Sequence, residues 1–135
     1  MSVTVKRLDH VNVRTANLDA MVEWYGRMLG METGKRPDFD FPGAWLYAGE
    51  DPVIHLVGVK VPARHAEDLA LEHFALSASG LRGLIDRAEA QGERYTLRKV
   101  PGFPIVQVNL WDPDGNHLHV DFDVAEAVAE GLTFD

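Results

Sequence analysis

Hydrophobic and polar positions near the start of the chain follow two different periods. The stretch from Val5 to Val13 reads as a strand of period two, with Val11 and Val13 on one face and Leu8, His10 and Asn12 on the other. The spacing then becomes helical, and we predict a helix that begins after Asn17 and ends at Gly30, a residue suited to a left-handed stop. The apolar positions of this helix are Leu18, Met21, Val22, Tyr25 and Leu29.

Two short apolar runs follow a loop over residues 35–43 that is rich in Gly and Pro. Residues 44–48 and 53–57 read as strands, and the break at 49–52, Gly-Glu-Asp-Pro, favours a hairpin turn between them. His55 shares a strand face with Val53 and Val57.

The same order of elements then starts again. Residues 71–77 predict a strand that carries His73, and a helix that ends at Gly92 follows, with Leu81, Leu84, Ile85 and Ala88 as its apolar positions. Strands are expected at 105–111 and 117–122, with the strong turn signal Asp-Pro-Asp-Gly-Asn at 112–116 between them. In the last strand one face carries His117, His119 and Asp121.

Each copy therefore reads β-α-β-β-β, with the first strand after the helix weakly defined near 31–35 and 93–99. We predict an α+β fold in which two tandem βαβββ modules form a curved, barrel-like mixed sheet with the helices outside. The whole chain, 1–135, would be one domain. Its parts would be a first module at about 4–60, a linker at 61–70, a second module at about 71–123 and a tail at 124–135 with a short acidic helix.

Four of the six histidines occupy matched positions in this repeat. His10 and His55 are 45 positions apart, and His73 and His119 are 46 positions apart. Imidazole is a common ligand of first-row transition metals, and a pseudo-symmetric fold would bring two such pairs toward one axis. The spacing predicts a metal centre between the two copies.

Composition and net charge limit the size of the fold and the kinds of partner that the protein could bind. A chain of 135 residues with 46% hydrophobic residues has the size of one compact domain. The formal net charge of −8 argues against nucleic acid and anionic membranes, and we expect a cytoplasmic protein because neither a secretion signal nor a membrane-spanning run is visible. Without cysteine, any metal must be held by nitrogen and oxygen ligands.

Four stretches of the chain resemble the vicinal oxygen chelate superfamily, which includes glyoxalase I, fosfomycin resistance enzymes, extradiol dioxygenases and bleomycin-binding proteins. They are Leu-Asp-His-Val-Asn-Val at 8–13, Trp-Tyr-Gly-Arg-Met-Leu-Gly-Met at 24–31, Glu-His-Phe-Ala-Leu at 72–76 and Asp-Pro-Asp-Gly-Asn at 112–116. The resemblance covers nearly the whole chain and implies the same two-module fold.

In metal-using members of that superfamily the ligands come from the first and last strand of each module. Those places fall on His10, His55, His73 and His119. The glyoxalase-like pattern has a glutamate at the place of His119 and commonly another at the place of His55, so this chain would have an all-histidine centre. Such a donor set favours a divalent transition metal, with Zn, Ni and Fe ahead of Mn.

A lyase or isomerase also needs a base close to the carbon acid. Asp121 and His117 share the strand face of His119 and are the first candidates, ahead of Glu72, Tyr47 and Tyr95. The resemblance places substrate-covering loops at 36–43 and 98–104. There Phe39, Trp45 and Phe103 would supply apolar walls, and Arg36 could bind an anionic group of a small aromatic or carboxylated substrate.

Three functions agree with these observations. The first is a metal-dependent, glyoxalase-like lyase or isomerase that acts on a small substrate with vicinal oxygens through an enediolate-type intermediate. The second is an Fe(II)-dependent ring-cleavage dioxygenase, and the third is a non-catalytic drug-binding protein of the bleomycin resistance type, whose acidic cup would attract a cationic ligand. Because open strand edges invite pairing, we also predict a homodimer, with its site built within one chain or across two.

Overall fold

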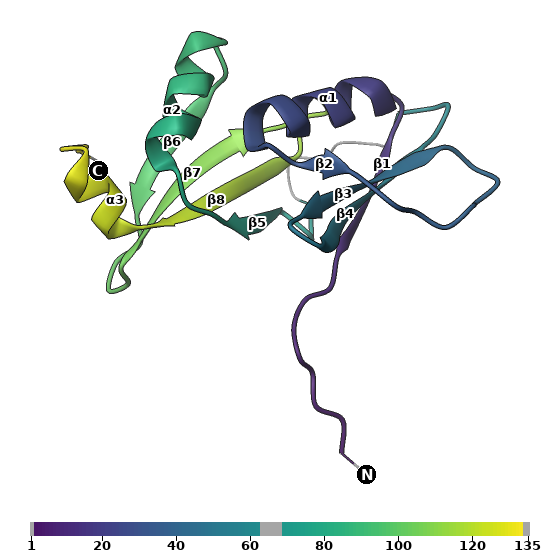
Figure 1. Cartoon of the computed structure of the whole chain (residues 1–135), viewed down its shortest axis with the longest axis horizontal. Coiled ribbons are helices and arrows are strands. Elements are labelled where there is room, and N and C mark those ends of the chain that lie inside the picture. The colour runs from purple at the N-terminus through teal and green to yellow at the C-terminus, as the bar shows by residue number, and fades with distance from the viewer. Residues whose placement is uncertain (1, 63–68, 134–135) are drawn as a thin grey trace. The chain divides into compact units, whose positions relative to one another are not determined.

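The computed structural model describes residues 2–62 and 69–133 and contains two compact units, one on each side of the junction between Arg64 and His65 (Figure 1). Most of the predicted linker, with His65 in it, lies outside the described residues. None of the described helices is long and apolar enough to cross a membrane.

The first unit follows the predicted order of elements. Strand β1 (Val11–Thr15) is followed by helix α1 (Leu18–Leu29), and the short β2 (Glu32–Thr33) precedes the hairpin of β3 (Gly43–Ala48) and β4 (Asp51–Gly58). The four strands form one sheet in the order β1-β4-β3-β2, with β1 parallel to β4 and the other pairs antiparallel. This parallel pair brings the first and last strand of the unit side by side.

The second unit repeats this arrangement. It comprises β5 (His73–Ser77), α2 (Leu81–Ala90), β6 (Tyr95–Lys99), β7 (Ile105–Trp111), β8 (His117–Asp123) and a short α3 (Val124–Ala129). Its sheet has the order β5-β8-β7-β6, and again the first and last strands of the βαβββ module, β5 and β8, are parallel neighbours. The predicted α+β fold with two tandem βαβββ modules is therefore confirmed.

Buried apolar side chains explain why these elements hold together. In the first unit α1 contacts β2, β3 and β4, and the buried residues of the helix and sheet include Met21, Trp24, Tyr25, Met28, Leu46, Ile54 and Leu56. In the second unit the buried residues include Leu81, Leu84, Ile85, Ala88, Val106, Val108, Leu110, Leu118, Val120 and Phe122. The helical positions recur every three to four residues, as expected for helices with one apolar face.

The sequence prediction was wrong about where the first strand lies. Pairing with β4 begins at Val11 and continues to Thr15, whereas residues 2–10 form neither strand nor helix. Val3 and Val5 are 91% and 85% exposed, so alternation of apolar residues in this segment does not reflect a buried face. Figure 1 shows the segment leaving the first unit as an extended chain. His10 consequently lies just before β1, next to its first residue.

Candidate metal centre

In the first unit, His55 is stacked between two other rings. Trp45 on β3 is its direct cross-strand partner, and the two ring centroids are 3.8 Å apart with planes 10° from parallel. His10 stacks on His55 with the same centroid distance, 3.8 Å, and the same angle, 10°. This stack fixes the planes of both imidazoles, so the local structure brings together the two histidines that the repeat had singled out in this half.

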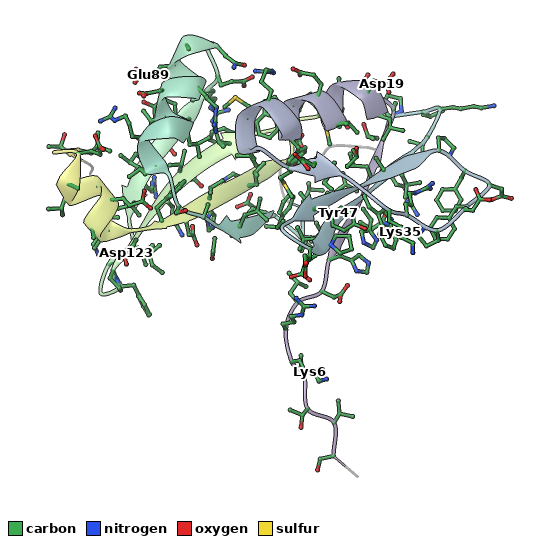
Figure 2. All side chains as sticks on the ribbon, viewed as in Figure 1. Lys6, Asp19, Lys35, Tyr47, Glu89 and Asp123 are labelled. Carbon is green, nitrogen blue, oxygen red and sulfur yellow. The ribbon has the colours of Figure 1, made fainter. Side chains whose placement is uncertain are left out.

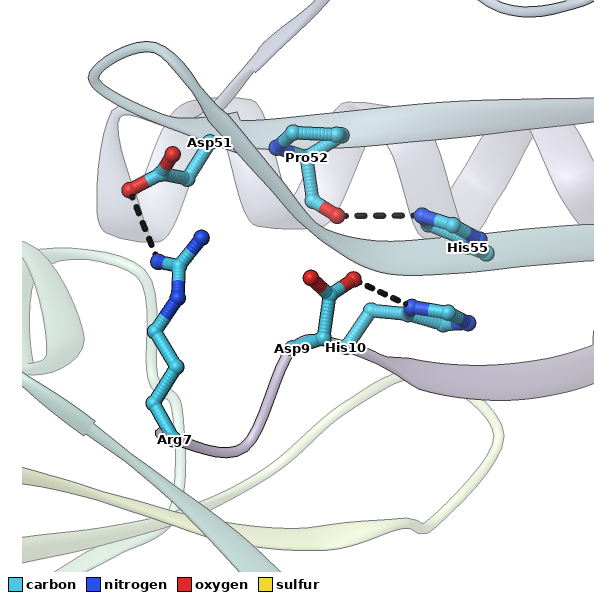
Figure 3. Close-up of polar contacts among 6 residues, drawn as sticks. All are labelled: Arg7, Asp9, His10, Asp51, Pro52 and His55. Atoms are coloured by element: carbon cyan, nitrogen blue, oxygen red, sulfur yellow. Dashed lines mark hydrogen bonds and ion pairs between the residues drawn. The ribbon is translucent and has the colours of Figure 1, made fainter. Parts of the chain in front are cut away.

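Hydrogen bonds then determine which ring nitrogens remain available (Figure 3). His10 donates from Nδ1 to a carboxylate oxygen of Asp9 at 2.8 Å, and His55 donates from Nε2 to the carbonyl oxygen of Pro52 at 3.0 Å. A neutral imidazole has one N–H and one lone pair, so these bonds leave Nε2 of His10 and Nδ1 of His55 as lone-pair donors. In Figure 3 both of these nitrogens point away from the Asp9 and Pro52 acceptors.

The pKa shifts of His55 and Asp9 agree with this arrangement. Burial is the main cause that lowers the pKa of His55 below the usual value of 6.5, and the neighbouring His10 lowers it further. The hydrogen bond from His10 is the main cause of the lowered pKa of Asp9. His55 is therefore held in the neutral form that metal binding requires, while Asp9 remains an anionic acceptor.

The second unit also gathers its histidines, on the parallel pair β5 and β8. His73 lies opposite His117 in the register, and its ring centroid is 5.1 Å from that of His117 and 4.8 Å from that of His119. His119 is buried and donates from Nδ1 to Asp121 at 2.6 Å. This contact confirms that His119 and Asp121 share one face of β8, and it leaves Nε2 of His119 as the lone-pair donor.

Glu72 joins two histidines of this unit. One of its carboxylate oxygens accepts from Nδ1 of His73 at 3.0 Å, and the other accepts from Nδ1 of His117 at 2.7 Å. These two hydrogen bonds, the one from His117 first, lower the pKa of Glu72. The other nitrogen of His117, Nε2, lies 2.8 Å from Oδ1 of Asn109, and Trp111 stacks on the same ring at 5.2 Å. Both nitrogens of His117 are therefore engaged.

The residues predicted to line a substrate pocket fall in both units. In the first, the Arg36 guanidinium lies 4.9 Å from the ring centroid of Phe39 and 5.1 Å from that of Phe41, and it also donates to the Phe41 carbonyl. Trp45 lies against His55, so an apolar wall adjoins the histidine pair. In the second unit Phe103 is 60% exposed.

Two of the weaker candidates for a base are engaged elsewhere. The hydroxyl of Tyr47 donates to the carbonyl oxygen of Lys35, and both residues can be found in Figure 2. The hydroxyl of Tyr95 donates to Glu89 at 2.7 Å, and this bond is the main cause of a raised pKa of Tyr95. Neither phenol is placed beside a histidine pair by these bonds.

Two features of the site were not found by sequence reasoning. The stacking of Trp45 on His55 depends on the β3–β4 register, and the bridging position of Glu72 depends on the β5–β8 register. A signal for the second was present, because Glu72 directly precedes His73, but adjacent residues on a strand normally point to opposite faces. Glu72 escapes that rule because it lies before the first residue of β5.

Comparison with known proteins shows the family. The model of the Glyoxalase/Bleomycin resistance protein/Dioxygenase superfamily matches residues 7–120. The chain belongs to this superfamily. The match spans both modules and includes all four repeat histidines.

Among curated superfamily relatives, "Glyoxylase I 4" of Arabidopsis thaliana is 28% identical over 120 residues, which cover 84% of this chain and 68% of the relative. Among solved structures, a glyoxylase/bleomycin resistance protein/dioxygenase domain from Frankia sp. matches with a TM-score of 0.73 at 18% identity, over 89% of this chain and 99% of that one. The trypanothione-dependent glyoxalase I of Leishmania major matches with a TM-score of 0.65 at 18% identity, over 94% and 99%. At these identities the solved structures confirm the fold.

Proposed function

We propose that this protein is a metal-dependent, glyoxalase-like enzyme, a lyase or isomerase that acts on a small substrate with vicinal oxygens through an enediolate-type intermediate. The observation that carries this proposal is the paired arrangement of imidazoles in each unit, His10 with His55 and His73 with His119. The relatives named glyoxalase I support the same class of reaction.

The donor set fits a divalent transition metal. We propose His10, His55, His73 and His119 as its ligands. Three of these histidines donate a ring N–H to a carboxylate, and the fourth donates to a backbone carbonyl. Such partners fix the tautomer and ring orientation of metal-bound histidines and increase their basicity. Nitrogen ligands favour Zn, Ni or Fe, and the ion would supply Lewis-acid polarisation of the substrate oxygens.

Proton transfer from the substrate carbon requires a base, and Asp121 and His117 are the two candidates. Both nitrogens of His117 are engaged by Glu72 and Asn109. The Asp121 side chain is 23% exposed and shares one oxygen with His119. We therefore propose Asp121 as the base that removes the proton α to the carbonyl and returns it to the neighbouring carbon, so that no atom is gained or lost.

A planar or carboxylated substrate suits the remaining groups. Trp45 presents an aromatic surface beside the histidine pair, and Arg36 with Phe39 combines a cation with an apolar ring in the same unit. We propose that these residues and Phe103 contact the substrate. We also propose that the enzyme is a homodimer, because β1 and β5 each end a sheet and edge strands offer unpaired backbone groups.

Two variants of Asp121 test the proposed base. Asp121→Asn keeps an oxygen that accepts from His119 Nδ1, so we expect metal content to stay unchanged and turnover to fall about 10²- to 10⁴-fold. Asp121→Ala removes the acceptor as well, and the loss of this partner should also weaken metal binding about 10- to 100-fold.

The measurements are elemental analysis and turnover on a panel of hydroxy-ketones and hemithioacetals of 2-oxoaldehydes. Turnover of Asp121→Asn equal to that of the unaltered protein would remove Asp121 from the mechanism. The matched control is Asp123→Asn, at the exposed end of the same strand.

A further inference from the structure

We propose that Glu72, His73 and His117 form a second binding position for a divalent transition metal, contained entirely in the C-terminal unit. This position requires neither His10 nor His55 and does not depend on the proposed reaction. One carboxylate oxygen and one nitrogen from each imidazole all lie within 4.8 Å of one another.

The β5–β8 register places these three donors together. His73 and His117 are direct partners on parallel neighbouring strands, and Glu72 precedes the first residue of β5. The carboxylate lies between the two rings, 3.0 Å from Nδ1 of His73 and 2.7 Å from Nδ1 of His117. An ion would take the place of the two shared protons, because metal binding to imidazole displaces protons.

The distances between the donor atoms are close to those found around a bound transition metal. With bonds of about 2.0–2.1 Å, ligand atoms around a tetrahedral zinc lie about 3.3 Å apart. The two nitrogen–oxygen distances, 3.0 and 2.7 Å to different oxygens of the carboxylate, are within about 0.6 Å of that separation, and the three donor atoms lie within 4.8 Å of one another. Three protein ligands with part-exposed side chains, 59% for Glu72, 40% for His73 and 21% for His117, also leave a fourth position open to water.

His117 is oriented for this role by its other contacts. Oδ1 of Asn109 can only accept, so Nε2 of His117 carries a hydrogen, and loss of the Nδ1 proton shared with Glu72 would leave the Nδ1 lone pair for the ion. Trp111 stacks on the ring with planes 15° from parallel. Hydrogen-bonded partners of this kind are typical of metal-bound histidines.

His73 belongs to both proposed positions but cannot serve them together. Nδ1 faces Glu72, which leaves Nε2 for the four-histidine centre, and a neutral imidazole has a single lone pair. The chain should therefore bind one ion through His73 at a time. Removing the histidines of the N-terminal unit should shift the ion to the Glu72 position and not abolish binding.

The experiment is a Co(II) titration of the full chain without a His-tag, followed by visible absorption and calorimetry. We expect the double variant His10→Ala/His55→Ala to bind about one equivalent, with a spectrum that differs from that of the unaltered protein. Adding Glu72→Gln or His117→Gln to the double variant should lower the affinity at least about tenfold. Glu50→Gln, in an exposed turn, is the matched control for loss of one negative charge and should have no effect.

Each result has a definite meaning. If the double variant binds no Co(II), or if Glu72→Gln leaves its affinity unchanged, the second position is refuted while the four-histidine centre stands. If the unaltered protein and the double variant bind equally tightly and both depend on Glu72, the second position is supported and the four-histidine centre fails. Thermal unfolding of each variant shows that it is folded.

Discussion

Individual side chains in this protein are arranged so that each repeat histidine has one nitrogen occupied and one available. The partners are Asp9, Pro52, Glu72 and Asp121, and each lies within three residues of its histidine in the sequence. Because these partners are close to their histidines in the sequence, each unit contains the groups that orient its own histidine rings. The sequence showed the four histidines, but their tautomers follow from hydrogen bonds of the folded chain.

The lowered pKa of His55 gives a prediction at this scale. In the metal-free protein we expect His55 to titrate below 6.5, because burial disfavours its charged form. A depressed pKa in the folded state means that this histidine contributes stability above pH 6.5, which is lost as the pH falls through the folded-state value.

NMR titration of the histidine ring protons measures this directly, with His55→Gln to assign the signal. A titration midpoint at or above 6.5 would contradict the burial and stacking described for His55.

At the scale of secondary structure, the sequence predicted most elements because their signals are local. Helix α1 begins and ends where apolar spacing and Gly30 predicted, and the Asp-Pro-Asp-Gly-Asn turn lies between β7 and β8. The first strand was misplaced because Val5 and Leu8 look like Val11 and Val13 in the sequence, and only pairing with β4 distinguishes them. Strand β2 has two residues, too few for a periodic signal.

Two glycines in different backbone conformations give a matched pair of stability predictions. Gly30 ends α1 with φ of +68°, where a side chain strains the backbone although space is free, so Gly30→Ala should destabilise by about 1 kcal/mol. Gly83 lies within α2, also with free space, and Gly83→Ala should stabilise by about 0.5–1 kcal/mol.

Urea unfolding followed by circular dichroism measures both changes. A Gly30→Ala variant as stabilising as Gly83→Ala would contradict the left-handed backbone conformation of Gly30 at the end of α1.

At the scale of the whole molecule, duplication explains how a small chain without cysteine can offer several candidate metal ligands. Each unit has a parallel pair of first and last strands, and two of the repeat histidines lie on or directly before the strands of each pair. The spacing of the repeat predicted the matched histidines. What it could not reveal is the difference between the halves, since Trp45 lies opposite His55 in one unit while Asn109 lies opposite His119 in the other.

The central claim is that the repeat histidines bind a divalent transition metal, and elemental analysis tests it most directly. Protein purified without a His-tag should carry about one equivalent of Zn, Ni or Fe per chain, and His73→Ala, measured alongside it, should lose that metal while remaining folded. An unaltered protein that takes up no metal even when it is supplied, or a His73→Ala variant with the same metal content, would contradict the account.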